Sequence, residues 1–132
     1  MSLLINEEQI EIKVYYIRKN NKIEVLDLEK DPAADLSNYK LETFSFKRPG
    51  WGEIRSILSE SVTITPSEEW KIDPWKYMDS RMKHLLKGWS LIDENEKKLP
   101  VTRANIDRLE FELVSHLNKA IDTQFGEATS LT

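Results

Sequence analysis

The first quarter of the chain alternates between apolar and polar positions. Residues 10–28 (IEIKVYYIRKNNKIEVLDL) carry β-branched and aromatic residues on both sides of the Lys-Asn-Asn triplet at 19–21, which is typical of a β-hairpin. A three-residue loop at 19–21 sets Lys13 opposite Asp27, an opposite-charge pair, whereas a two-residue loop sets it opposite Leu28. We therefore predict the three-residue loop, with both faces of the hairpin partly covered.

The next elements are a loop, a strand and a short helix. Residues 29–40 are polar and predict a loop. Residues 41–47 (LETFSFK) alternate again and predict a third strand, which ends before Pro49 because proline cannot donate to a central ladder. Residues 51–60 (WGEIRSILSE) follow the 3.6-residue period instead and predict a helix, with Trp51 in its apolar stripe.

A longer amphipathic segment follows. Residues 65–68 (TPSE) have the form of a capping box with proline at the first helical position, so a helical turn is expected there. The stronger start signal is Asp73-Pro74, an acidic cap before a proline. Apolar residues then recur at helical spacing, and we predict a helix that runs from Asp73 to Gly88.

The last part of the sequence predicts a connector and a final helix. Residues 93–97 (DENEK) indicate a small hairpin or an extended excursion. Thr102 is the expected cap of the last helix, whose apolar stripe runs from Ile106 to Ile121.

The order of the elements, strands first and helices afterwards, predicts an α+β fold. We expect an N-terminal antiparallel β-hairpin plus a third strand, packed with three C-terminal amphipathic helices. The 132 residues suffice for one domain, which we place at residues 1–125, with a flexible C-terminal tail at 126–132.

Composition and charge exclude several classes of function. The net charge of −4 argues against general nucleic-acid binding, which requires clustered positive charge. The chain has no cysteine and therefore no thiol chemistry. No stretch approaches the roughly 18 apolar residues of a membrane helix, and the start MSLLINEEQ lacks the features of a signal peptide. These features favour a protein that stays in the cytoplasm.

Candidate catalytic residues are few. His84 and His116 stand outside any metal-binding spacing such as HExxH, and the acidic pairs are sequence neighbours that do not face each other. The four glycines form no phosphate-binding loop. We therefore expect no catalytic residues, no cofactor and no metal, and read the histidines as solvated or edge residues.

The four tryptophans suggest binding to protein instead, because indole rings dominate interface hot spots. Three of them lie on or beside apolar helix stripes, where a core position is the simpler interpretation. Trp70 differs because it lies in a charged turn, SEEWKIDPW, where it is either a lid on the core or a partner contact. Methionines on the 73–88 helix would suit an adaptable surface. The candidate partner-binding residues are Trp70, Trp75, Met78, Met82 and Trp89, unless these faces simply pack on the strands.

The stretch LLKGWSLIDENEKKLPVTRANIDRLEFELVSHLNKAI resembles the C-terminal part of tail assembly chaperones of tailed bacteriophages. In these proteins a helix ends in Gly-Trp, and a short acidic connector, a Leu-Pro-x-Thr punctuation and a final amphipathic helix follow. Residues 44–61 (FSFKRPGWGEIRSILSES) resemble the strand, proline and helix that precede them. The connector lacks an expected glycine at 95–97, and the N-terminal hairpin has no counterpart. The matching positions are Gly88, Trp89, Asp93, Glu94, Leu99, Pro100 and Thr102.

The resemblance implies a non-enzymatic assembly factor. Such chaperones hold the tape measure protein soluble during tail morphogenesis, tend to self-associate, and act in the host cytoplasm. The alternative is a structural component of the virion, such as a tail, baseplate or head–tail connector subunit. In that case the hairpin would add to the sheet edge of a neighbouring subunit.

Overall fold

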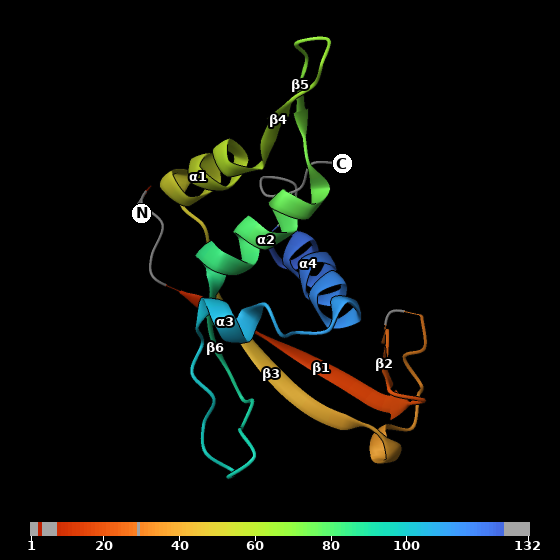
Figure 1. Cartoon of the computed structure of the whole chain (residues 1–132). Helices are drawn as coiled ribbons and strands as arrows, with labels where there is room; N and C mark the ends of the chain where they lie inside the picture. Colours follow the sequence, from red (N-terminus) through yellow and green to blue (C-terminus); the bar gives the residue numbers. More distant parts are fainter. Residues whose placement is uncertain (1–2, 4–7, 29, 126–132) are drawn as a thin grey trace.

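The computed structural model describes residues 3, 8–28 and 30–125 (Figure 1). Its main sheet is fully antiparallel, with the strand order β2-β1-β3-β6. A separate pair of short strands, β4 and β5, forms a hairpin of its own. The strands are β1 (Gln9–Lys19), β2 (Lys22–Val25), β3 (Lys40–Lys47), β4 (Val62–Ile64), β5 (Trp70–Ile72) and β6 (Leu86–Trp89).

The helices lie on one side of the sheet. Figure 1 shows α2 and α4 side by side above the sheet, with α1 beyond α2. The fold is therefore of the α+β class that the sequence predicts, and the tail predicted at 126–132 lies outside the described residues. The helices are α1 (Trp51–Ser61), α2 (Pro74–Leu85), the short α3 (Arg103–Ile106) and α4 (Phe111–Phe125), and a single 3₁₀ turn spans Leu36–Asn38.

The core lies between the sheet and the helices. Ile12 pairs with Phe44 across β1 and β3, and strand alternation turns both side chains toward α2 and α4. On the opposite face of β1, Lys13 is exposed and Tyr15 is half-buried. The buried cluster comprises Ile12, Val14, Phe44, Phe46, Ile57, Tyr77, Met82, Leu85, Leu86, Trp89, Leu117 and Ile121.

The turn between β1 and β2 has two residues, so the predicted three-residue loop is wrong. Asn20 and Asn21 adopt φ angles of 50° and 66°. Positive φ at both central positions is typical of a type I′ turn, whose twist matches that of the flanking strands. The ladder ends at the pair Tyr16–Val25, and Lys13 therefore does not pair with Asp27.

Helix α2 begins as predicted but ends earlier. Asp73 caps it, since its Oδ1 accepts hydrogen bonds from the backbone N–H of Trp75 at 2.9 Å and of Lys76 at 3.2 Å. The helix ends at Leu85 rather than Gly88, because the next four residues form β6 and pair with β3. Pairing with the sheet and burial of Trp89 override the helical spacing of the sequence.

Three further expectations for the turns and caps have different outcomes. The helical turn expected at 65–68 is wrong, because these residues form the loop between β4 and β5. The small hairpin at 93–97 is confirmed by the backbone hydrogen bond from Asp93 N–H to Lys97 O at 2.8 Å. Thr102 caps only α3, a single turn, and α4 starts separately at Phe111.

A buried arginine links the two helices that cover the sheet. Arg81 of α2 is only 2% exposed, and its Nη2 lies 2.8 Å from Oδ1 of Asp122 on α4. The guanidinium also stacks over the ring of Tyr77, 5.0 Å from its centroid, and donates to the carbonyl of Asn118 at 3.4 Å. The charge of Arg81 is therefore compensated from both helices.

Removing the carboxylate of this pair should destabilise the fold strongly. We expect Asp122→Ala to lower the free energy of unfolding by about 2–3 kcal/mol, because a buried guanidinium loses its counter-charge. This is less than for a fully buried pair, since the Asp122 side chain is 38% exposed. Urea unfolding measures the effect, and the exposed pair Lys19–Glu24 supplies the control Glu24→Ala, expected to cost less than about 1 kcal/mol. Equal losses in the two variants would contradict the role assigned to Arg81.

Candidate protein-binding surface

The β4–β5 hairpin forms an arm that projects from the helices on the side opposite the main sheet (Figure 1). Its loop is closed by Thr65, whose N–H donates to the Glu69 carbonyl at 2.9 Å and whose Oγ1 accepts from the Glu69 N–H at 3.2 Å. Glu68 takes the positive φ of 63° that the tight loop requires. Thr-Pro-Ser-Glu is thus a hairpin loop, and β-branched residues extend it on both sides.

One face of this arm is entirely apolar. The register pairs Val62 with Ile72 and Ile64 with Trp70, so these four side chains share a face and define the apolar arm face. Trp70 is 72% exposed and Ile64 is 61% exposed. Thr63 and its partner Lys71 occupy the other face.

Such an arm is an unusual place for apolar side chains. An isolated two-stranded hairpin is at best marginally stable in water, because it cannot bury its own apolar face. Exposed aromatic and aliphatic residues that are contiguous typically mark a surface that another protein covers. The apolar arm face is therefore the strongest candidate binding surface of the described residues.

Trp75 extends the aromatic surface from the base of the arm. It lies in the first turn of α2, three residues after Ile72, and is 66% exposed. Its ring is 5.5 Å from that of Phe111, with a tilt of 45°, so it links the start of α2 to the start of α4. Phe111 is itself exposed, and this aromatic pair is accessible from solvent.

The other predicted partner contacts lie elsewhere. Met82 and Trp89 are buried in the core, and Trp89 donates its Nε1–H to the Leu99 carbonyl at 2.6 Å. Met78 is half-buried. Trp51, which the helical pattern assigns to the core, is instead 71% exposed on α1. Of the five candidates, the structure places Trp70 and Trp75 on the surface and Met82 and Trp89 inside.

His84 belongs to a cluster of polar residues on α1 and α2, in which Ser80 is buried and Glu60 is partly exposed. Its Nε2 lies 3.1 Å from the carboxylate of Glu60, and Ser80 donates its hydroxyl to the same carboxylate at 2.7 Å. The hydrogen bond from Ser80, with a smaller contribution from His84, lowers the pKa of the Glu60 carboxyl. Ser80 therefore contacts the carboxylate and not the imidazole, whereas an activated serine nucleophile needs a hydrogen bond to its base.

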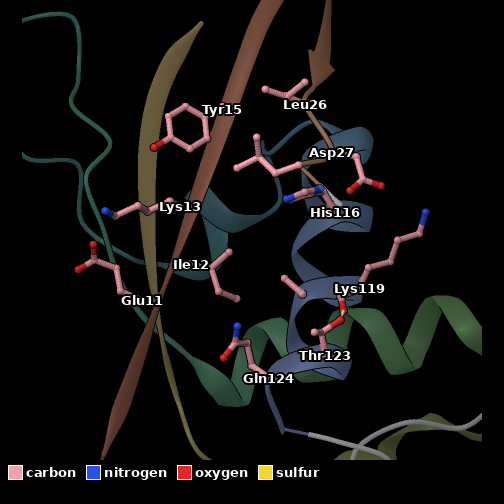
Figure 2. A pocket seen from close by; sticks show the side chains of 12 residues that line it. Glu11, Ile12, Lys13, Tyr15, Leu26, Asp27, His116, Lys119, Thr123 and Gln124 are labelled. Atoms are coloured by element: carbon pink, nitrogen blue, oxygen red, sulfur yellow. Dashed lines mark hydrogen bonds between the residues drawn. The ribbon is translucent and has the colours of Figure 1, made fainter. Parts of the chain in front are cut away.

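His116 lines a trough between β1 and α4, which we call the α4 trough. Figure 2 shows His116 on α4 beside Asp27, with Ile12 of β1 pointing toward the helix. Burial lowers the pKa of His116, and the nearby charge of Lys119 acts in the same direction, while Asp27 opposes it. The trough has a volume of about 460 Å³ and is lined by Glu11, Ile12, Lys13, Tyr15, Leu26, Asp27, Leu28, His116, Lys119, Ala120, Thr123 and Gln124.

The described residues contain no group of three or more histidine, cysteine or acidic side chains arranged to hold a metal ion. Within the same residues, no helix has the length and apolar character needed to cross a bilayer. Comparison with known proteins finds no matching family model, no matching curated protein and no matching solved structure.

The environment of His116 predicts a pH dependence of stability. Its pKa in the folded state lies below its ordinary value of about 6.5, so the unfolded state takes up the proton more readily. The associated stability is complete above about pH 6.5 and is lost as the pH falls through the folded-state pKa. We expect His116→Gln to lose less stability than the wild type between about pH 7.5 and pH 5.5 in urea unfolding. Lys119→Gln, which removes a repelling cation, should show an intermediate loss, and equal losses in all three proteins would contradict this interpretation.

Proposed function

We propose that this protein is a non-enzymatic assembly factor that binds other proteins through the apolar arm face. The observation that carries the proposal is the exposure of Ile64 and Trp70, side by side on a hairpin that leaves the body of the domain. These side chains do not stabilise the monomer while they are in water, whereas binding of a partner that covers them is favoured by the burial of their apolar surface.

The resemblance of residues 44–121 to phage tail assembly chaperones supplies the partner. We propose that the arm holds an apolar segment of the tape measure protein during tail morphogenesis, in the cytoplasm of the host. The arm lies in the gap between the two resembling segments, residues 44–61 and residues 85–121, which flank it on either side. A chaperone of this kind needs accessible apolar side chains on a stable domain, which is the arrangement of the arm on α1 and α2.

Co-expression with the tape measure protein encoded by the same genome tests the proposal. The wild type should increase the soluble fraction of that protein, and the double variant Ile64→Ser/Trp70→Ser should not. Loss of a tryptophan hot spot typically costs at least about 2 kcal/mol, so we expect purified complexes to weaken by about 30-fold or more. The matched control is Thr63→Ser/Lys71→Gln on the opposite face of the same arm, with an expected change of less than about threefold.

Unfolding and particle composition complete this test. Because Ile64, Trp70 and Lys71 are exposed and Thr63→Ser keeps the hydroxyl of a half-buried residue, both double variants should keep the cooperative unfolding of the wild type, and binding can then be compared directly. Mass spectrometry of purified particles should not detect a chaperone. Stoichiometric amounts of the protein in mature virions would instead support the structural subunit, and an unchanged affinity of Ile64→Ser/Trp70→Ser would exclude the arm as the binding surface.

A further inference from the structure

One edge of β1 is only partly paired. On one side β1 pairs with β3 from Gln9 to Tyr16, which includes the whole of Glu11–Val14. On the other side, β2 pairs only with the C-terminal end of β1, from Tyr16 to Lys19. The last backbone hydrogen bond between the two segments runs from Leu26 N–H to Tyr15 O at 2.8 Å. Among the described residues no strand pairs with Glu11–Val14 on this second side.

The main-chain groups of this segment point to the open side at every second residue. The carbonyl of Tyr15 faces β2, while that of Glu8 faces the β3 side and accepts from Arg48 N–H at 3.2 Å. Strand alternation therefore directs the N–H and C=O groups of Glu11 and Lys13 toward the open side. These groups can pair with an added strand in the manner of a sheet ladder.

The α4 trough gives this edge a wall and a limited volume. In Figure 2, Ile12 points toward α4, whereas Glu11 and Lys13 point away from it on the outer face of the sheet. The volume of about 460 Å³ falls within the range of about 300–1,000 Å³ of pockets that hold small ligands. The trough therefore has room for a short extended segment beside β1.

We propose that an extended peptide segment of a partner protein adds antiparallel to β1 in the α4 trough, by β-augmentation. Its central residue is small and apolar because it lies opposite Ile12 and near Ala120 of the trough. An acidic residue precedes it, opposite Lys13, and a basic residue follows it, opposite Glu11. The side chains of Glu11 and Lys13 are exposed. Residues directly opposite each other on neighbouring strands bring their Cβ atoms to about 4.5–5.5 Å. The partner motif, read from its N-terminus, is acid–apolar–base.

A second copy of this chain is a weaker occupant of the edge. Its β1 carries the same order in Glu11-Ile12-Lys13, so the charges alone would permit pairing. However, its β1 edge is also walled by α4, and two such helices would have to share one trough of about 460 Å³. A peptide segment without its own covering helix meets no such obstacle.

The test uses a capped peptide, Thr-Glu-Val-Lys-Thr, added to the full chain and followed by NMR and hydrogen exchange. We expect binding at peptide concentrations of about 1 mM, the affinity scale of a few kcal/mol, with slowed exchange of the Glu11 and Lys13 amides. N-methylation of the peptide Glu or Lys should weaken binding by at least about tenfold, because these N–H groups pair with β1. N-methylation of the central Val should change affinity by less than about twofold, since that N–H points away.

Charge exchange supplies the matched control. The swapped peptide Thr-Lys-Val-Glu-Thr should bind the wild type several-fold more weakly and should recover on the double variant E11K/K13E. Equal effects of the N-methyl groups, equal binding of the two peptides, or absence of binding at about 1 mM would overturn the proposal. A peptide-free dimer in which the Glu11 and Lys13 amides are already protected would overturn it too, and would place a second copy at this edge. None of these outcomes bears on the arm, which lies on the other side of the domain.

Discussion

Pairing of Leu86–Trp89 with β3 is the constraint on which the rest of the structure depends. It extends the sheet by a fourth strand and fixes the point at which α2 must end. Trp89 then enters the core, edge-on to Phe44 with the ring centroids 6.4 Å apart, and its indole N–H holds the following hairpin at the Leu99 carbonyl. Because the C-terminal end of α2 is anchored to the sheet, its N-terminal end and the arm before it lie away from the sheet.

The same constraint explains why an arginine is buried between the helices. Once α2 is fixed over the sheet, it packs against α1 and against α4, and Arg81 lies on the side that meets α4. A charge at such a position is tolerated only when it is paired and hydrogen-bonded, and Asp122 and Asn118 provide both from α4. Together with the burial of Leu117 and Ile121 in the core, the pair holds α4 in place, and α4 forms one wall of the α4 trough beside β1.

Local signals in the sequence suffice for the parts of this fold that local interactions determine. The third strand, α1 and the Asp73 cap follow from alternation, helical period and capping chemistry within a few residues. The end of α2 does not, because residues 86–89 continue the helical spacing and only their distant partner β3 makes them a strand. Adjacent asparagines favour positive φ and so point to the two-residue turn, whereas the matching of apolar residues and of Lys13 with Asp27 across the hairpin favours the wrong register.

In the candidate site, too, the sequence indicates what depends on neighbouring residues but not what depends on distant ones. The charged surroundings of Trp70 in the sequence point to its exposure, whereas Ile64 and Ile72 went unrecognised as its neighbours on one face. Their signal is a period of two on both sides of Thr-Pro-Ser-Glu, visible in VTI and WKI. Trp51 and Met82 could not be placed from helical spacing, because a period of 3.6 residues identifies a stripe and not the partner that covers it.

The arm and the β1 edge would bind by different physical interactions. The arm presents side chains to be buried, so its affinity rests on apolar area and tolerates many sequences. The β1 edge presents main-chain groups beside a pair of opposite charges, so it selects an extended conformation and a charge order. Because the two surfaces lie on opposite sides of the domain, one partner can engage both only if a flexible segment spans the domain. A partner that is held in an unassembled state, as in the proposed function, would offer such segments, and two weak contacts on one chain bind far more tightly than either alone.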